Sequence, residues 1–308
     1  MKIYFDNVSF NSPRGKDSFA RHLWSVLKEE HKITTDINDA DIHVAFIASK
    51  IFNSNIPLVQ RIDGIYFNSK MNNEKINTNL LKTYKEATFV IIQSEFDKKI
   101  ITNFFGDRPN REVIHNGTDI ELINTIKPME HSFFDRFETV WTCASRWHKP
   151  HKRLKENIRY FLEHSSPRDC LAIAGNVPKK ITHERIICFG DLKWEKLISL
   201  YRRSKYFIHL ALVDHCPNVV VDSRGAGCKI ICSSLAGTEE IAGKDAIVIE
   251  DMDWDYKTTF DYRVPPKLDF SRKRKGRFDN SIDIKEVAVQ YLKVFNFVTK
   301  AGDFTNAY

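Results

Sequence analysis

The sequence predicts an α/β protein with two doubly wound parallel sheets, and three observations support this fold class. Residues 1–125 alternate short apolar runs with amphipathic segments, which is typical of parallel strands connected by helices. A polar stretch over residues 126–138, which contains Pro128 and has no apolar period, then interrupts the pattern as an interdomain linker does. The alternation resumes at residue 139, and 308 residues leave room for two domains with separate cores.

The first half supplies five expected strands and three expected helices. Its first helix, residues 18–30, carries Phe19, Leu23, Val26 and Leu27 on one face. The expected strands cover residues 2–5, 42–48, 58–61, 89–93 and 112–115, and the other helices cover residues 74–85 and 95–105.

The second half repeats the same architecture without an internal repeat. Strands are expected at residues 139–144, 170–174, 186–189, 206–213, 229–233 and 246–249, and helices at 153–163, 193–204 and 217–225. A polar, basic segment, residues 251–280, precedes a last helix at 284–300. We therefore expect domains at 1–125 and 126–282, with the helix at 283–300 packing back on the first. Two such layers facing across a cleft would suit a nucleotide-linked substrate.

Composition excludes several classes of protein. With 42% hydrophobic and 28% charged residues the chain is typical of soluble globular proteins, and it lacks the ~18-residue apolar run of a membrane span. The N-terminus enters a strand directly, so we expect no signal peptide and a cytoplasmic location. Six cysteines without a CxxC pattern predict reduced thiols, with Cys143, Cys188 and Cys232 in the core. The net charge of +7 favours an anionic partner: a nucleoside diphosphate, a nucleic acid or an acidic membrane surface.

The most informative segment follows the expected strand 206–213. Asp214 and Asp222 have seven residues between them, and Pro217 is expected in the first turn of the intervening helix. A helix that begins just past the carboxyl end of a strand offers free N–H groups and a favourable dipole to a phosphate. Asp222, one to one and a half turns into the helix, would then reach the hydroxyls of an attached ribose. Such pairs of aspartates also occur on solvated helix faces.

A second basic segment, Arg146-Trp-His-Lys-Pro-His-Lys152, follows the first strand of the second half. Arg146 with its bidentate guanidinium and Lys152 with its point charge would clamp a diphosphate from both sides. The alternative is a basic surface turn.

Together, these segments resemble the retaining glycosyltransferases of family 4, which have the GT-B fold of two Rossmann-like domains. The resemblance covers most of residues 1–250 and rests on segments in the family's order. These are His115-Asn-Gly-Thr-Asp119, Ser145-Arg-Trp-His-Lys-Pro-His-Lys152, Phe189-Gly-Asp191, the pair Asp214 and Asp222 with Asn218-Val-Val-Val between them, and Leu235-Ala-Gly-Thr-Glu-Glu-Ile241.

The resemblance implies an acceptor-binding first domain, a donor-binding second domain, and transfer of a sugar from a UDP- or GDP-sugar to a glycan or glycoconjugate hydroxyl with retained configuration. It makes Arg146, Lys152 and Asp214 the catalytic residues. No cofactor and no metal are expected, because the cations would neutralise the leaving diphosphate. The donor-binding residues that it implies are Gly15, Phe189, Gly190, Pro217, Asn218, Val219 and Asp222.

The sequence departs from the family pattern at both carboxylates and in the first loop. Both carboxylates are aspartates where the family has glutamates. The glycine-rich first loop is Asn11-Ser-Pro-Arg-Gly-Lys16, in which Arg14 or Lys16 would replace backbone contacts with charge. Asp63, before Gly64, either contacts the acceptor or the transferred sugar, or caps a turn.

Two other motifs are discounted. Asp251-Met-Asp253 resembles a metal-binding Asp-x-Asp, but its position after the last strand favours a solvated acidic turn. The run at residues 271–277 is typical of a mobile basic loop, with peripheral membrane contact as a minor option; nucleic acid is not expected. The alternative functions are a non-catalytic sugar-nucleotide or glycan-binding module, and a glycosyltransferase acting on DNA or at a membrane surface.

Overall fold

The computed structural model describes residues 1–12, 14–52 and 55–305, and it divides into two compact units. The first comprises residues 1–117, 255–260 and the chain from Ser281 on, and the second comprises residues 118–254 and 261–280. The division after Gly117 lies earlier than the expected boundary at residue 125. In addition, the segment 255–260 returns to the first unit.

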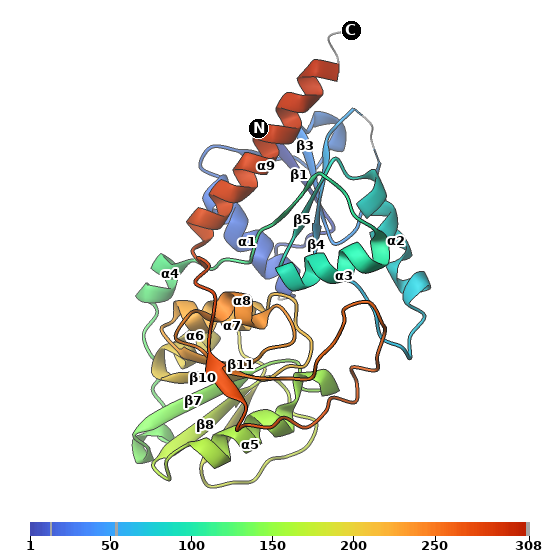
Figure 1. The fold of residues 1–308 in the computed structure, drawn as a ribbon. Coiled ribbons are helices and arrows are strands. Elements are labelled where there is room, and N and C mark those ends of the chain that lie inside the picture. The colour runs from blue at the N-terminus through green and yellow to red at the C-terminus, as the bar shows by residue number, and fades with distance from the viewer. Residues whose placement is uncertain (13, 53–54, 306–308) are drawn as a thin grey trace. The chain divides into compact units, whose positions relative to one another are not determined.

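The first unit contains a six-stranded, fully parallel sheet in the order β2-β1-β3-β4-β5-β6 (Figure 1). Caps fix its helices: Asn72 accepts a hydrogen bond from Lys75 N before α2, and Ser94 accepts one from Asp97 N before α3. The elements are β1 (Lys2–Asp6), α1 (Gly15–Leu27), β2 (Lys32–Ile33), a 3₁₀ turn (Ile37–Asp39), β3 (Ile42–Phe46), β4 (Leu58–Ile62), α2 (Asn73–Glu86), β5 (Phe89–Ile92), α3 (Glu95–Phe105), β6 (Arg111–Val113) and α9 (Ile284–Thr305).

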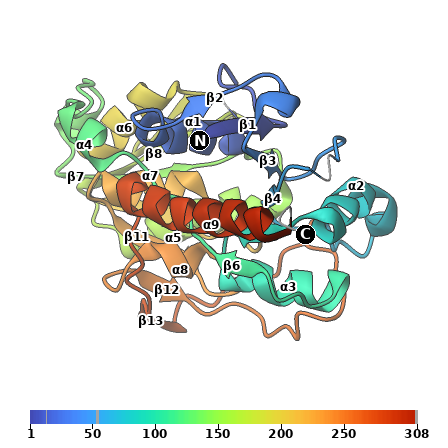
Figure 2. The same ribbon diagram turned by 90° about the horizontal axis from the view of Figure 1, so that it is seen from above.

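Helices cover both faces of this sheet. On one face α1 lies alongside α9 (Figures 1 and 2), and Phe19 and Tyr291 from these helices share a core with Val59 of β4. The next residue, Gln60, points to the opposite face, where its amide donates to Leu80 O of α2 at 3.2 Å. The C-terminal helix is therefore part of the first unit's core.

The second unit contains a seven-stranded sheet in the order β13-β12-β11-β10-β7-β8-β9, parallel except for its edge strand β13. On one face Trp141 of β7 packs on Phe161 of α5. Thr142, on the other face, is hydrogen-bonded to Ser204 at the end of α6. The helices α5 and α6 are labelled beside this sheet in Figure 1. The elements are α4 (Ile120–Thr125), a 3₁₀ turn (Phe134–Arg136), β7 (Thr139–Ala144), η3 (Pro150–Lys152), α5 (Leu154–His164), β8 (Asp169–Ala174), β9 (Ile186–Gly190), α6 (Trp194–Arg203), β10 (Tyr206–His209), α7 (Asn218–Gly225), β11 (Lys229–Ser233), α8 (Thr238–Ala242), β12 (Ile247–Ile249) and β13 (Lys273–Lys275).

The structure confirms the predicted α/β class with two doubly wound sheets and changes several details. The apolar run 206–213 is a strand only to His209, and residues 210–213 are a buried connection. The polar stretch 126–138 is not a featureless linker, since its 3₁₀ turn buries Phe134. The basic run 271–277 contains β13, so it is not a free loop.

Cysteine placement agrees with the sequence at two of three positions. Cys143 and Cys232 are buried, and burial raises the pKa of each thiol. Cys188 is exposed, so its prediction as a core residue is wrong: it lies on β9, the edge strand of its sheet. Within the described residues, no helix is both long and apolar enough to span a bilayer.

Candidate functional site

The candidate site lies at the carboxyl edge of the second unit's sheet. The chain leaves β7, β9 and β10 at this edge, because these strands run parallel, and the loops after β7 and β10 carry the predicted residues. In open α/β sheets ligands bind outside the carboxyl ends of the strands. This edge is thus where the chemistry of the second unit is expected.

Asp214 is the centre of a partly buried charge cluster. Its Oδ2 forms an ion pair with Nζ of Lys152, 62 residues earlier, and a 2.8 Å hydrogen bond with Nε2 of His209. Burial alone would raise the pKa of Asp214. The ammonium of Lys152 and the hydrogen bond from His209 outweigh burial and hold that pKa well below its usual range. The structure therefore joins two of the predicted catalytic residues, Lys152 and Asp214, and adds His209.

The sequence prediction does not include His209, although a histidine inside the apolar run 206–213 is a signal that could have indicated it. It ends β10 with a side chain that is 3% exposed, and burial lowers its pKa. At neutral pH its imidazole is accordingly uncharged. With Nε2 protonated, it donates to Asp214 and orients the carboxylate without adding charge.

The turn after β7 supplies an excess of positive charge. Arg146 is exposed, and no side-chain partner for its guanidinium lies within the described part of the chain. Lys149, which the sequence analysis left out, lies between the two predicted cations. Burial and the positive charges of Arg146 and Lys152 lower its pKa. Among the described residues, only Lys152 of these three cations is ion-paired with a carboxylate, that of Asp214, and this excess of positive charge leaves the turn able to bind an anion.

His151 stabilises the turn while remaining neutral. Its carbonyl accepts a hydrogen bond from Leu212 N at 2.8 Å, which ties the turn to the connection after β10. Burial, with Lys152 next, lowers the pKa of His151 to about 3. The side chain is uncharged at neutral pH, and the cationic groups of the turn are arginine and lysine.

α7 begins one residue later than predicted. Pro217 is its N-cap, with φ −70° and ψ 118°, and does not lie in its first turn. Asn218 and Val219 are the first two helical residues and are partly exposed. Backbone N–H groups at such a position, together with the helix dipole, favour a phosphate. The structure therefore places these three predicted donor-binding residues at the expected edge of the sheet.

Asp222 lies in the second turn of α7 and is 5% exposed. Its Oδ2 accepts a 3.1 Å hydrogen bond from Nε1 of Trp194, the first residue of α6. This indole is a partner that sequence reasoning missed. The two predicted carboxylates, Asp214 and Asp222, consequently have different surroundings: one is ion-paired and the other is held by a neutral donor.

At the end of β9, Phe189 packs its ring on His131 and Phe134, with centroids 5.3 and 6.0 Å away. The side chain thus faces the segment before β7. Gly190 has φ 65°, a left-handed conformation that favours glycine, and its carbonyl accepts from Gly175 N at 2.7 Å. Any contact of these residues with a base would involve the backbone more than the phenyl ring.

In the first unit, Asp63 follows β4 and is 23% exposed. It forms an ion pair with Arg61 and accepts a 2.8 Å hydrogen bond from Nε2 of Gln93, after β5. Arg61 is fully buried and donates to Oδ1 of Asn116 at 2.6 Å. Asp63, which is the predicted contact to the acceptor or the sugar, therefore belongs to a charge-balanced cluster of polar side chains at the carboxyl edge of this sheet.

The loop before α1 is only partly described, because Pro13 lies outside the described residues. Gly15 opens α1, and Arg14 is its exposed N-cap. Lys16 binds Asn7 O and, at 2.9 Å, Oδ1 of the buried Asp17. Its ammonium is therefore used locally, which leaves Arg14 as the better placed of the two predicted cations.

The structure corrects the assignment of Asp251 to a solvated turn. Asp251 is 6% exposed and pairs with the buried Arg153, whereas Asp253 is exposed. Asp251 lies two residues after the buried strand β12, and this position places its side chain in the interior of the second unit. Among the described residues, no group of three or more His, Cys, Asp or Glu side chains is arranged to hold a metal ion.

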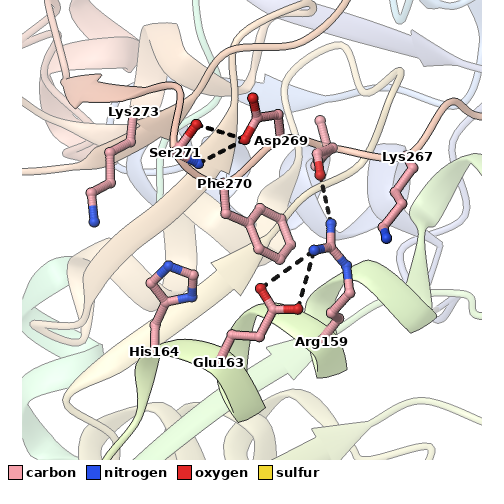
Figure 3. Close-up of a pocket in the computed structure, with 9 residues that line it drawn as sticks. Arg159, Glu163, His164, Lys267, Asp269, Phe270, Ser271 and Lys273 are labelled. Carbon is pink, nitrogen blue, oxygen red and sulfur yellow. Dashed lines mark hydrogen bonds and ion pairs between the residues drawn. The ribbon is translucent and has the colours of Figure 1, made fainter.

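A pocket of about 610 Å³ lies elsewhere on the second unit, between the end of α5 and the segment 267–273 (Figure 3). Arg159 pairs there with Glu163, at 3.2 Å, and lies 3.7 Å from the centroid of Phe270. Glu163 and His164 end α5 shortly before β8 begins, so the pocket is at the amino edge of the sheet. It is separate from the predicted site residues.

No protein-family model and no curated protein sequence matches the chain. Solved structures do match. Sucrose-phosphate synthase from Thermosynechococcus elongatus has a TM-score of 0.68 at 12% identity, covering 98% of this chain and 100% of that one. HepE from Anabaena in complex with UDP-glucose has a TM-score of 0.61 at 12% identity, covering 98% and 99%. WaaG, a glycosyltransferase involved in lipopolysaccharide biosynthesis, has a TM-score of 0.54 at 10% identity, covering 100% and 96%.

These matches extend over nearly the whole chain and over nearly the whole of each neighbour. At identities of 10–12% they establish the architecture. The chain has the two-domain, Rossmann-like α/β fold of the GT-B glycosyltransferases.

Proposed function

We propose that this protein transfers a sugar from a nucleoside-diphosphate sugar, with UDP or GDP as the nucleotide, to a hydroxyl of a glycan or glycoconjugate acceptor. The observation that carries the proposal is the cluster of Lys152, Asp214 and His209 beside Arg146, whose guanidinium has no side-chain partner among the described residues. It combines an anion-binding turn with an oriented carboxylate at the carboxyl edge of a parallel sheet. Complexes of HepE with UDP and with UDP-glucose agree with such a donor.

The proposed roles follow from charge. Departure of the diphosphate leaves negative charge on its oxygens, which Arg146, Lys152 and the N-terminus of α7 would stabilise most in the transition state. The diphosphate competes with Asp214 for Lys152. Because His209 also binds Oδ2 of Asp214, the carboxylate keeps one partner when the lysine turns to the phosphate.

The remaining predicted residues position the substrates. Asp222 would bind the ribose hydroxyls, sharing its carboxylate with Trp194. Asp63 would orient the acceptor or the transferred sugar from the carboxyl edge of the first unit's sheet, where Arg61 and Gln93 hold its carboxylate in place.

We further propose retention of configuration without a metal ion. The acceptor hydroxyl would attack the anomeric carbon of the sugar on the face from which the diphosphate leaves, and the leaving phosphate would accept the proton of that hydroxyl. Arginine and lysine would provide the neutralisation that a divalent cation provides elsewhere.

Donor turnover tests this proposal. Purified protein is incubated with UDP- and GDP-sugars in the presence of EDTA, release of the nucleotide is followed, and the anomeric configuration of the product is read by NMR. Lys152→Ala should lower kcat/KM by about 10²- to 10³-fold, since it removes a charge that acts on the transition state. Lys155→Ala, an exposed lysine three residues further on, is the matched control and should keep wild-type activity. Equal activity of the two variants would refute the role of Lys152.

A peripheral membrane location is a secondary proposal. Lys273 and Lys275 of β13 are exposed, whereas Arg274 between them is paired with Glu239 and Glu250. Alternation along the strand thus presents two lysines to an anionic surface. Co-sedimentation with phosphatidylserine vesicles, but not with phosphatidylcholine vesicles, is expected for the wild type and should be lost in a Lys273→Gln/Lys275→Gln variant.

A further inference from the structure

The turn that carries Lys152 ends in an unusual backbone conformation. Arg153, which follows η3 and precedes α5, has φ 52° and ψ 49°, in the left-handed region that residues with a Cβ seldom occupy. It is at once the C-cap of η3 and the N-cap of α5, so this conformation sets the change of direction between them. A residue other than glycine adopts it only where its surroundings hold it there.

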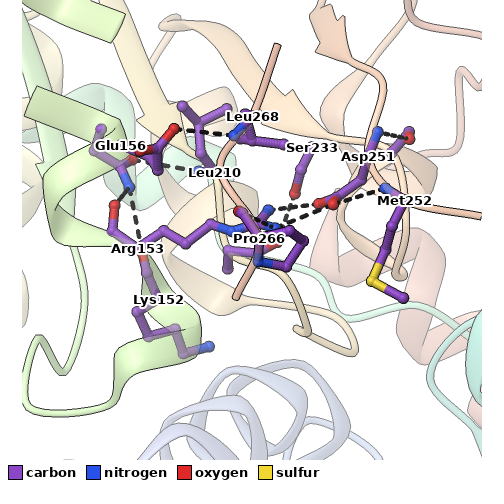
Figure 4. Close-up of polar contacts among 12 residues, drawn as sticks. Lys152, Arg153, Glu156, Leu210, Ser233, Asp251, Met252, Pro266 and Leu268 are labelled. Atoms are coloured by element: carbon purple, nitrogen blue, oxygen red, sulfur yellow. Dashed lines mark hydrogen bonds and ion pairs between the residues drawn. The ribbon is translucent and has the colours of Figure 1, made fainter. Parts of the chain in front are cut away.

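The side chain of Arg153 provides that restraint (Figure 4). It is 1% exposed, and its two terminal nitrogens bind the two carboxylate oxygens of Asp251 at 2.5 and 3.1 Å. Nη2 also donates to Pro266 O at 3.0 Å, and Oδ1 of Asp251 accepts from Met252 N at 2.9 Å. A buried, bidentate pair of this kind fixes the position of both partners closely.

The backbone of the turn is fixed from its other side. The amide of Asn157 donates to Lys152 O at 3.2 Å and to Arg153 O at 2.7 Å, and its Oδ1 accepts from Leu210 N at 3.3 Å. Figure 4 shows the Lys152 and Arg153 side chains leaving the turn in different directions. Arg153 reaches into the core toward Asp251, and the ammonium of Lys152 is left to meet Asp214.

We propose that Arg153 is a positioning residue for Lys152. Its ion pair with Asp251 holds residue 153 in the left-handed conformation, and that conformation directs the lysine toward Asp214 and the phosphate site. Rotation of residue 153 to negative φ would turn the peptide plane between residues 152 and 153 and displace the lysine. The inference rests on the proposed function, because it concerns binding of the nucleotide diphosphate by Lys152.

A matched pair of variants separates the backbone effect from the loss of the ion pair. Arg153→Gly and Arg153→Ala both remove the guanidinium and leave Asp251 unpaired, but only glycine adopts the left-handed conformation freely. Affinity for UDP, and for GDP in parallel, is measured by calorimetry on the folded protein in each variant and in the wild type. Arg153→Ala should weaken binding about tenfold, as expected when a positioned group is displaced. Arg153→Gly should recover most of this loss.

Each variant is also made in a Lys152→Ala background, where the difference between glycine and alanine should disappear. If both single variants fail to fold, the same pair is built with Asp251→Asn, which removes the uncompensated buried charge. Equal affinities of the glycine and alanine variants, or a difference that persists without Lys152, would overturn the inference. Failure of the wild type to bind any nucleotide would instead overturn the proposed function.

Discussion

Two histidines at the candidate site are kept neutral, and this has a consequence for stability. Burial, followed by the charge of Lys152, lowers the pKa of His151 to about 3, and burial lowers the pKa of His209. In the unfolded chain both imidazoles bind a proton near pH 6.5. Between pH 6.5 and 3 the unfolded state therefore binds more protons than the folded state, and the free energy of unfolding must fall as the pH falls.

His151→Gln should flatten this acid-dependent loss. The variant removes a group that is neutral in the folded protein and charged in the unfolded one, so its stability should depend less on pH below 6.5. Urea denaturation at pH 7.5, 6.5, 5.5 and 4.5 gives the slope. His148→Gln, at an exposed position in the same turn, is the control. A slope that is unchanged in His151→Gln would mean that the imidazole is already charged in the folded protein.

At the residue scale, the sequence predicted which side chains share the site better than it predicted their bonds. The spacing of strand ends indicated that Lys152 and Asp214 belong together. The ion pair between them, and the partners His209 and Trp194, depend on contacts between segments far apart in the chain. The chemistry of Asp251 was misjudged for the same reason, because its partner Arg153 lies 98 residues away.

At the scale of elements, β13 is held by charge as well as by its ladder. Glu239 at the start of α8 is 2% exposed, and it pairs with Arg274 of β13 and, at 3.1 Å, with Arg277. Burial alone would raise the pKa of Glu239, but the hydrogen bonds from both arginines outweigh it and lower that pKa. A basic run that is typical of a loop becomes an edge strand because a buried carboxylate lies beside it.

Glu239→Gln should therefore destabilise the protein by about 2 kcal/mol, since it weakens the charge-assisted hydrogen bonds of a buried side chain to Arg274, which keeps Glu250 as a partner, and to Arg277. Lys273→Gln changes an exposed charge on the same strand and should shift stability by less than about 0.5 kcal/mol. Urea denaturation compares the two. A Glu239→Gln variant as stable as Lys273→Gln would show that the ladder with β12 suffices.

The elements themselves were predictable wherever apolar periodicity is strong, as in α1 and β3. The short helices α4 and α8 and the strand β13 lack such periodicity and exist through tertiary contacts. β10 ends four residues before its apolar run does, because residues 210–213 are buried in a connection whose backbone bonds Asn157 and His151. In residues 210–213, apolar character indicates that the chain is buried and does not indicate that it forms a strand.

At the scale of the whole chain, α9 completes the first unit from the opposite end of the sequence. Its side chains at Tyr291 and Phe295 are fully buried against α1 and the sheet, whereas Phe297 is 55% exposed. Gly117 permits this close approach, because a Cβ at that position would lie 2.9 Å from Cγ2 of Val287. The helix could be predicted from periodicity, but its register against α1 could not.

Phe295→Ala should lower the free energy of unfolding by about 3–5 kcal/mol through lost burial and the cavity that remains. Phe297→Ala removes the same atoms from the exposed side of the same helix and should cost about 1 kcal/mol or less. Thermal and urea unfolding of both variants test this. Similar losses in the two would mean that α9 does not form part of the core.

The proposed function requires the second unit to bind a nucleoside diphosphate through cations at the carboxyl edge of its sheet. The most direct measurement is a thermal-shift panel of UDP, GDP, ADP and dTDP with EDTA, on the wild type, on Arg146→Ala and on the exposed control Arg168→Ala. We expect one nucleotide to raise Tm by about 3 °C or more at saturating concentration. The shift should persist in Arg168→Ala and be lost in Arg146→Ala. The absence of a shift with every nucleotide at millimolar concentration would show that the second unit does not bind a nucleoside diphosphate.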